Sequence, residues 1–257
     1  MVSLDDIVVG FRYGDGSEVR ALDRVSLTIG EGEFVTVVGN NGAGKSTLLN
    51  VVAGTIVPIR GRVVMNGTDV TRWDDARRAR WVARVFASAA DSTCGPLTIE
   101  ENFAVALRRG GARGLRWYLG KPERNAIRER VRLLGLGLED RLGTPMELLS
   151  SGQRQSLSVL MATMTRPKVL LLDEHVANLD PGTQERVMGL SERLVREQHL
   201  TTLMVTHDIE HALRYGDRLV ALERGRIVLD VAGKEKADLT EDDLQALYRK
   251  PLPRVAA

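Results

Sequence analysis

The sequence predicts an α/β protein whose 257 residues form a mainly parallel sheet core, an N-terminal antiparallel β subdomain and a helical insertion. Short apolar runs carry the prediction of the core, because fully buried parallel strands have this composition. These runs are Phe34–Val38, Val169–Leu172 and Thr201–Val205. Strand-like runs disappear between Leu97 and Leu149, where the spacing of apolar residues becomes helical, and this change indicates the insertion.

Composition narrows the class of protein. Hydrophobic residues make up 43% and charged residues 27% of the chain, which favours a packed core over disorder. The net charge of +2 argues against a nucleic-acid partner, and the single cysteine, Cys94, suits a reducing compartment. Met1–Gly10 lacks an apolar signal core, and no run approaches the roughly 18 apolar residues of a membrane span. We therefore expect a membrane role only through a spanning partner.

Strands and helices alternate in the part of the chain before Leu97. Tyr13–Gly16 has the residues of a turn between the first two strands, and Asn66-Gly67 predicts a tight turn after the strand at Arg62–Met65. In chain order we expect strands at Leu4–Arg12, Ala21–Ile29 and Phe34–Val38, a helix from Leu48–Ala53, a strand at Arg62–Met65, a helix at Thr71–Trp81, a strand at Val82–Phe86 and a loop at Ala87–Gly95.

Capping signals set the helices expected after Leu97. Thr98 and Glu101 form a capping box ahead of a helix over Asn102–Leu107, and Ser150 and Ser151 are good N-cap residues for a helix that ends near Thr165. The other expected segments are helices at Pro122–Leu134, at Thr183–Gln198 and from Thr240 to about Tyr248, and strands at Val169–Leu172, Thr201–Val205, Arg218–Leu222 and Arg226–Val231.

The stretch after the strand Phe34–Val38 fits G-x-x-x-x-G-K-[ST], the phosphate-binding P-loop. Its glycines permit close backbone approaches, so that backbone N–H groups form an anion nest before a helix N-terminus. Lys45 supplies a positive charge for the β- and γ-phosphates, and the Ser46 hydroxyl is a ligand for Mg²⁺. The predicted nucleotide-binding residues are Gly39, Asn40, Asn41, Gly42, Ala43, Gly44, Lys45, Ser46 and Thr47.

Polar residues follow two of the other predicted strands. Asp173 and Glu174 end the run from Val169, where open α/β sheets place ligands. Asp173 can hold Mg²⁺, and Glu174 can accept the proton of a water that attacks a phosphate. His207 follows Thr201–Val205, a position that favours a hydrogen bond to the γ-phosphate or the water over a structural role. We predict Glu174 and His207 as catalytic residues, and Ser46 and Asp173 as metal-binding residues.

Two further segments are candidates for nucleotide contacts. Ser150, Ser151, Gly152 and Gln153 open a helix and make a second anion site. Tyr13 lies in a turn, where an aromatic ring can stack on adenine or serve as an ordinary turn residue; the residues alone leave both open.

Together these residues resemble the nucleotide-binding subunit of an ABC (ATP-binding cassette) transporter over nearly the whole chain. Gly39–Ser46 resembles its Walker A motif and Val169–Asp173 its Walker B motif, with Glu174 as catalytic base. The other correspondences are Leu149–Gln153 with the signature, Asn178–Asp180 with the D-loop, His207 with the switch histidine and Tyr13 with the adenine-stacking aromatic.

The resemblance implies an ABC ATPase fold in a single domain, 1–257. Residues 1–86 and 166–257 would form a RecA-like core with a β subdomain, and residues 87–165 a helical subdomain that includes the signature helix. The implied cofactors are ATP and Mg²⁺. The implied assembly is a homodimer or pair of ATPase subunits, with ATP between the P-loop of one subunit and Ser150–Gln153 of the other.

The resemblance also implies partners and a location. The pair would sit on membrane-spanning permease subunits, at the cytoplasmic face of the inner (plasma) membrane. The segment from Asp173 to Asp180, with His175 where many members have proline, resembles a bacterial subgroup linked to extracytoplasmic solute-binding proteins. We therefore expect import of an amino acid or similar small solute.

Two positions depart from the family pattern. Ser151 stands where the signature has its first glycine, and Ala87 stands where the family has a glutamine that contacts Mg²⁺ and the attacking water. Our hypothesis is that ATP binding survives while hydrolysis or its coupling is weakened. The alternative is a degenerate cassette that binds ATP and regulates without turnover. A soluble ABC ATPase of translation or DNA repair is disfavoured, because those carry two cassettes or a long coiled-coil insertion.

Overall fold

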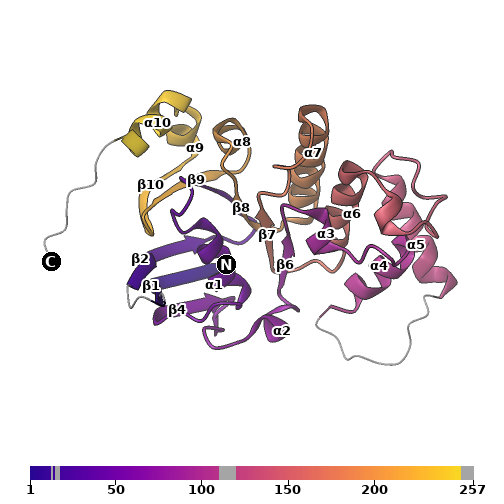
Figure 1. The fold of residues 1–257 in the computed structure, drawn as a ribbon, viewed down its shortest axis with the longest axis horizontal. Helices are drawn as coiled ribbons and strands as arrows, with labels where there is room; N and C mark the ends of the chain where they lie inside the picture. Colours follow the sequence, from indigo (N-terminus) through magenta and orange to yellow (C-terminus); the bar gives the residue numbers. More distant parts are fainter. Residues whose placement is uncertain (13, 15–17, 110–119, 250–257) are drawn as a thin grey trace, which may run out of the picture. The chain divides into compact units, whose positions relative to one another are not determined.

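The computed structural model describes residues 1–12, 14, 18–109 and 120–249 (Figure 1). It divides the chain into two compact units, Met1–Arg72 with Leu203–Ala257, and Trp73–Thr202. The predicted helical subdomain, 87–165, falls within the second unit, and its separation from the core stays a prediction.

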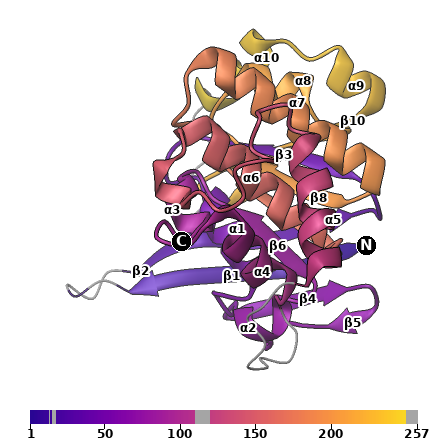
Figure 2. The same cartoon turned by 90° about the vertical axis from the view of Figure 1, so that its right-hand side faces the viewer.

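The first unit contains the antiparallel sheet that the sequence predicted. Its strand order is β2-β1-β4-β5, with β2 at Glu18–Ile29, β1 at Val2–Arg12, β4 at Arg60–Met65 and β5 at Thr68–Asp69. β1 pairs antiparallel with both β2 and β4, and the ribbon of β1 and β2 is seen in Figure 2. Val2, Leu4, Ile7 and Val9 are buried, so that one face of β1 covers the core.

The same unit holds a second group of strands in the order β10-β9-β3-β8. β3 (Phe34–Val38) is buried at every residue and pairs parallel with β9 (Arg218–Glu223), which pairs antiparallel with β10 (Arg226–Ala232). β8 (Thr201–Val205) contains the boundary between the units. The helices are α1 (Lys45–Ala53), α8 (Ile209–Arg214), α9 (Gly233–Ala237) and α10 (Glu241–Arg249).

The second unit is mostly helical around one parallel strand pair, β6 (Val82–Val85) and β7 (Val169–Asp173). Its α-helices are α2 (Asp75–Arg78), α3 (Ala89–Ser92), α4 (Ile99–Leu107), α5 (Lys121–Arg132), α6 (Ser151–Met164) and α7 (Pro181–Gln198), and a 3₁₀ turn spans Met146–Leu148. Both predicted capping boxes are present, Thr98 with Glu101 and Ser150 with Gln153.

The helix predicted over Thr71–Trp81 is wrong, because only Asp75–Arg78 is helical. The Asp69 carboxylate accepts bonds from the backbone N–H and the hydroxyl of Thr71, at 2.9 and 2.6 Å, and this holds a turn there. Asp74 then caps α2 by accepting from the Arg77 N–H at 2.8 Å. The loop predicted at Ala87–Gly95 likewise contains α3, which Ser88 caps.

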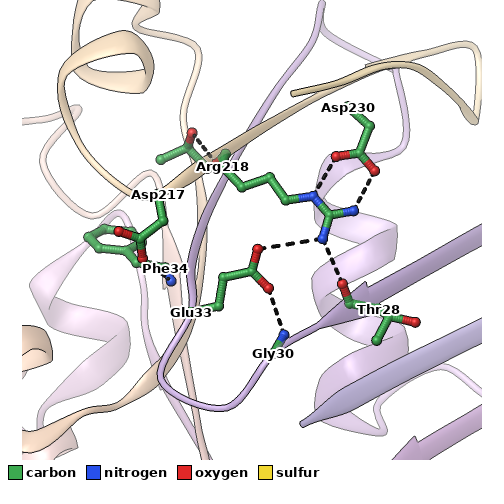
Figure 3. Close-up of polar contacts among 8 residues, drawn as sticks. Thr28, Gly30, Glu33, Phe34, Asp217, Arg218 and Asp230 are labelled. Carbon is green, nitrogen blue, oxygen red and sulfur yellow. Dashed lines mark hydrogen bonds and ion pairs between the residues drawn. The ribbon is translucent and has the colours of Figure 1, made fainter. Parts of the chain in front are cut away.

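Polar contacts anchor the start of β3 to β9, as Figure 3 shows. The Phe34 N–H donates to the Asp217 carboxylate at 2.9 Å, and the Asp217 N–H donates to the Phe34 carbonyl at 2.6 Å. The Arg218 guanidinium binds both oxygens of Asp230 and donates to the Thr28 carbonyl at 2.9 Å. Hydrogen bonding to Asp230 raises the pKa of Arg218, whose guanidinium links β2, β9 and β10.

The loop that leaves β3 is held against β2 and the β9–β10 turn by contacts that only glycine permits. A Cβ at Gly39 would lie 2.4 Å from the Leu222 carbonyl oxygen, and one at Gly44, where φ is 105°, would lie 2.4 Å from that of Ala21. The Gly225 N–H donates to the Ala43 carbonyl at 2.9 Å. The shape of this loop therefore depends on three separate parts of the first unit.

An ion pair reinforces the same arrangement from the surface. Arg226, the first residue of β10, places its Nη2 2.5 Å from a carboxylate oxygen of Asp23 on β2. Next to it, the Asp23 N–H donates to the Gly225 carbonyl at 2.8 Å. The hydrogen bond to Arg226 lowers the pKa of Asp23 below its usual 3.8, despite the opposing effect of burial.

We predict that Gly44→Ala destabilises the protein more than Gly42→Ala, by about 2 kcal/mol. Both positions have positive φ, but at Gly42 no heavy atom of the described residues lies within 4 Å of the added Cβ. The difference therefore isolates the clash with Ala21 from the backbone strain. Urea unfolding without nucleotide measures it, and equal destabilisation of the two variants would contradict it.

We predict that Arg226→Gln lowers the melting temperature at pH 7 by the equivalent of about 1 kcal/mol, as expected of an ion pair whose arginine is half exposed. Because the folded state lowers the pKa of Asp23, this contribution is present above pH 3.8 and is lost as the pH falls through the folded pKa. Melting curves of the parent and the variant should therefore converge below pH 3.8. Arg224→Gln, an equal charge change in the same turn, is the control, and a gap that persists in acid would contradict the assignment.

Candidate functional site

The P-loop motif lies between β3 and α1, and its backbone folds around Lys45. The Lys45 ammonium donates to the carbonyl oxygens of Gly39 at 2.7 Å and Asn40 at 3.2 Å, and the residue is only 6% exposed. The Ala43 N–H donates back to the Asn40 carbonyl at 3.0 Å, which closes the loop into a turn. The loop thus places a buried positive charge at its centre.

The first turn of α1 is suited to an anion. Its N-cap is Gly44, no acidic residue lies in the turn, and within the described residues no side chain caps it. The N–H groups at the start of the helix therefore present the positive end of the helix dipole. Ser46 and Asn41 are exposed, and Thr47 is half-buried. A phosphate group is the kind of ligand that such a helix start accepts.

His207 lies close in the fold to this loop. It follows β8 directly, and the N–H of the preceding residue, Thr206, donates to the Val37 carbonyl at 3.1 Å. Val37 is two residues before Gly39 on β3, so that the ends of β3 and β8 are neighbours. Asp208 caps α8 by accepting from the His211 N–H at 2.9 Å, which directs the chain away after an exposed His207. The first unit therefore brings together the P-loop and the predicted switch histidine.

The second unit holds the predicted acidic pair at the end of β7. Asp173 is the last residue of the strand, and one carboxylate oxygen lies 2.5 Å from the Arg84 Nη2 on β6. Glu174 has a positive φ of 47°, a conformation that costs about 1 to 3 kcal/mol for a residue other than glycine. The Ala177 N–H holds this turn by donating to the Glu174 carbonyl at 2.9 Å.

The segment after Glu174 is tied to α7. His175 is buried, and its Nε2 lies 3.0 Å from the Ser191 hydroxyl oxygen. Because that hydroxyl donates to the Val187 carbonyl at 2.8 Å, His175 is the donor in the pair. Asp180 caps α7 by accepting from the Thr183 N–H at 3.1 Å, and these bonds with Thr183 lower the Asp180 pKa. His175 therefore has a packing role.

The predicted signature residues form the start of α6. Ser150 and Gln153 cap the helix reciprocally, with bonds of 3.1 and 3.3 Å, and Ser151 is exposed in its first turn. A Cβ at Gly152 would lie 2.3 Å from the methyl carbon of Thr183, so that this glycine allows α6 to approach the start of α7. A hollow of about 480 Å³ opens beside these residues, between α6, α7 and the leucines that follow α5, Leu133, Leu134 and Leu136.

The strand end that precedes Ala87 is held by amide side chains. The Gln155 amide, on a residue only 1% exposed, donates to the Phe86 carbonyl at 2.9 Å. The Asn178 amide donates to the Ala87 carbonyl at 3.4 Å. The backbone at Ala87 therefore keeps contacts with the signature helix and with the segment after β7, although its side chain offers no polar atom.

The two predicted metal-binding residues carry oxygen ligands, which Mg²⁺ prefers. No group of three or more acidic, histidine or cysteine side chains that could hold a metal is found among the described residues. Ser46 lies in the first unit and Asp173 in the second, and each offers an oxygen of the kind that binds an ion that keeps its waters. Tyr13 lies outside the described residues, so that its predicted stacking role stays a prediction.

Two residues near the predicted site residues, Arg84 and Gly225, did not stand out in the sequence. Arg84 is a charge inside the apolar run Val82–Val85, and that anomaly could have drawn attention to a buried partner. Gly225 lies in a hairpin turn, and its contact with the P-loop has no local signal because Ala21 and Ala43 are distant in sequence.

The sequence matches the family described as ABC transporter over residues 22–177. It is 42% identical over 232 residues to the tyrosine transport ATP-binding protein of Clostridioides difficile, which covers 90% of this chain and 91% of that protein. It is 38% identical over 249 residues to the phosphonates import ATP-binding protein PhnC of Frankia casuarinae, covering 95% and 96% of the two chains.

Solved structures agree with the sequence matches. The dimeric ATP-binding cassette MJ0796 bound to ADP and Pi superposes with a TM-score of 0.77 at 30% identity, covering 90% of this chain and 98% of that one. The ADP conformation of MJ1267, an ATP-binding cassette of an ABC transporter, gives 0.79 at 26% identity, covering 96% and 98%. None of the described helices has both the length and the apolar character needed to cross a membrane. The chain is thus a member of the ABC transporter family and has the ABC ATPase fold of its ATP-binding cassettes.

Proposed function

We propose that this chain binds ATP with Mg²⁺ and hydrolyses it to power the import of a small solute, with an amino acid such as tyrosine as the first candidate. The observation that supports it most is the loop around Lys45, whose buried ammonium and uncapped helix start suit a triphosphate. The cargo rests on the relative named as a tyrosine transport ATP-binding protein. Relatives named for phosphonates and methionine make these the next solutes to compare.

In this mechanism the P-loop side chains bind the phosphates, and the side chains at the ends of β7 and β8 act on Mg²⁺, the attacking water and the γ-phosphate. Lys45 leaves the carbonyl oxygens of Gly39 and Asn40 for the phosphates, and the N–H groups at the start of α1 bind phosphate oxygens. Ser46 and Asp173 would hold Mg²⁺, and the ion would supply positive charge that neutralises the phosphates. Glu174 accepts a proton from the attacking water, and His207 hydrogen-bonds the γ-phosphate.

The complete site needs a second ATPase subunit. By family resemblance, Ser150, Ser151, Gly152 and Gln153 of one subunit cover the ATP that lies in the P-loop of the other, and Tyr13 stacks on adenine. ATP bridges the two faces, whereas ADP reaches less far, so that closure follows from differential binding. The pair would act on permease subunits at the cytoplasmic face of the inner membrane. An extracytoplasmic solute-binding protein would deliver the solute to the permease.

A second candidate is a cassette that binds ATP with weak or uncoupled hydrolysis and a regulatory role. Ala87 and Ser151 are the observations that favour it, because alanine cannot orient a water and serine adds bulk at the signature. Against it stand Glu174 and His207, and the contacts that hold the backbone at Phe86 and Ala87. Turnover by the assembled transporter separates the two candidates.

We predict that Glu174→Gln binds ATP but loses turnover by about 100-fold or more, because the amide cannot accept the water's proton. It should form an ATP-dependent dimer in gel filtration, since ATP is no longer consumed. Cells that carry only this variant should fail to take up labelled tyrosine.

The matched control is Glu197→Gln, which removes an exposed carboxylate from α7. It should leave turnover, oligomeric state and uptake as in the parent. A monomeric Glu174→Gln protein in saturating ATP would count against the sandwich dimer. Normal tyrosine uptake in cells that lack the gene would exclude that cargo, and the same assay is then run with methionine and a phosphonate.

We predict that Ala87→Gln raises ATP turnover of the transporter, assembled with its permease, by about tenfold, because an amide at this position orients the attacking water. Ala87→Leu, which adds volume without polar atoms, should not raise it. An unchanged rate in Ala87→Gln would mean that Ala87 is not what limits hydrolysis.

A further inference from the structure

Arg84 places a second cation on the carboxylate that the proposed function assigns to Mg²⁺. Its Nη2 lies 2.5 Å from the Asp173 Oδ2, and the two side chains are only 15% and 16% exposed. Hydrogen bonds between ionised partners in such partly buried places are stronger than those at the surface. The pair is therefore a specific contact of this chain at the end of β7.

The geometry of the strands sets this contact. β6 and β7 pair in parallel, with Arg84 opposite Leu171 and Val85 opposite Leu172. Side chains at alternate positions point to the same face, so that Arg84 and Asp173 share one face of the pair. The Arg84 guanidinium also lies over the Phe86 ring, 4.6 Å from its centroid, and this contact orients the side chain.

A charge inside an apolar strand is costly unless it is compensated, and Asp173 provides the compensation. The guanidinium donates to one carboxylate oxygen, Oδ2, and partly offsets the negative charge of Asp173. Mg²⁺ binds carboxylate oxygens through their negative charge and is repelled by a neighbouring cation. The two cations therefore compete for one carboxylate.

We propose that Arg84 is a positioning residue that holds Asp173 in the absence of Mg²⁺ and lowers the affinity of the ATP-bound protein for this ion. The proposal rests on the proposed function, in which Asp173 is a Mg²⁺ ligand. In this proposal Arg84 determines the Mg²⁺ concentration at which this cassette binds ATP tightly. It gives Arg84 no contact with ATP.

The test is equilibrium binding of a non-hydrolysable ATP analogue, first in EDTA and then at stepped concentrations of free Mg²⁺. The Mg²⁺ midpoint is the free Mg²⁺ concentration at which half of the Mg²⁺-dependent gain in analogue affinity is reached. For Arg84→Gln this midpoint should fall about tenfold, which is the scale of one charged hydrogen bond. Affinity in EDTA should not rise, because without the ion the released Asp173 carboxylate can only repel the triphosphate. Should Arg84→Gln fail to fold, Arg84→Met fills the same strand position with an apolar side chain and should show the same shift.

Two controls separate this effect from a general change of charge. Arg77→Gln removes an equal charge from the same unit, where the guanidinium lies 4.0 Å from the Trp73 ring centroid, and should leave the Mg²⁺ midpoint unchanged. In an Asp173→Asn background, Arg84→Gln should have no further effect, since the shared carboxylate is gone.

Each outcome decides the matter. A Mg²⁺ midpoint that is unchanged or raised in Arg84→Gln overturns the proposal, as does an equal shift in Arg77→Gln or in the Asp173→Asn background. A parent protein that binds the analogue equally well at every Mg²⁺ concentration removes Asp173 as a Mg²⁺ ligand. A parent that binds no analogue at all overturns the proposed function, and this result is distinct from the others.

Discussion

The close approach of backbone to backbone around the P-loop is the constraint on which the first unit depends. The carbonyl oxygens of Leu222 and Ala21 lie only 2.4 Å from where a Cβ would stand on Gly39 and Gly44, respectively. The loop can keep its shape only while β9 and β2 stay in place, and the Gly225 contact adds the turn between β9 and β10. A phosphate cradle made of backbone N–H groups has no side chains to adjust, so that its precision must come from this support.

In the second unit, side-chain hydrogen bonds hold the backbone at the ends of β6 and β7. Gln155 of α6 and Asn178 of the segment after β7 bind successive carbonyl groups, of Phe86 and Ala87. Arg84 joins the two strands through Asp173. The backbone at Phe86 and Ala87 is therefore connected to the predicted signature helix and to the segment after β7, although Ala87 has no polar side chain.

Local chemistry explains which elements were predictable. The capping boxes at Thr98 and Ser150 need only residues three positions apart, and both are formed. The buried strand β3 agrees with its prediction because its apolar run has no competing pattern. The prediction of a helix over Thr71–Trp81 is wrong because Asp69 and Asp74 accept hydrogen bonds from nearby backbone N–H groups and hold the chain in turns. The helical spacing of the apolar residues does not reveal these bonds.

The sequence by itself determined the family, the order of the motifs and the kind of ligand, because phosphate loops and strand-end carboxylates follow from residue types at short spacing. Only the tertiary structure decided what those residues touch. It placed His207 beside the end of β3, gave His175 to packing against Ser191, and put Arg84 on Asp173. Such contacts join residues far apart in the chain, and their energies depend on burial and distance that no local pattern encodes. The P-loop was readable as a motif, but the support that makes its glycines necessary was visible only in the fold.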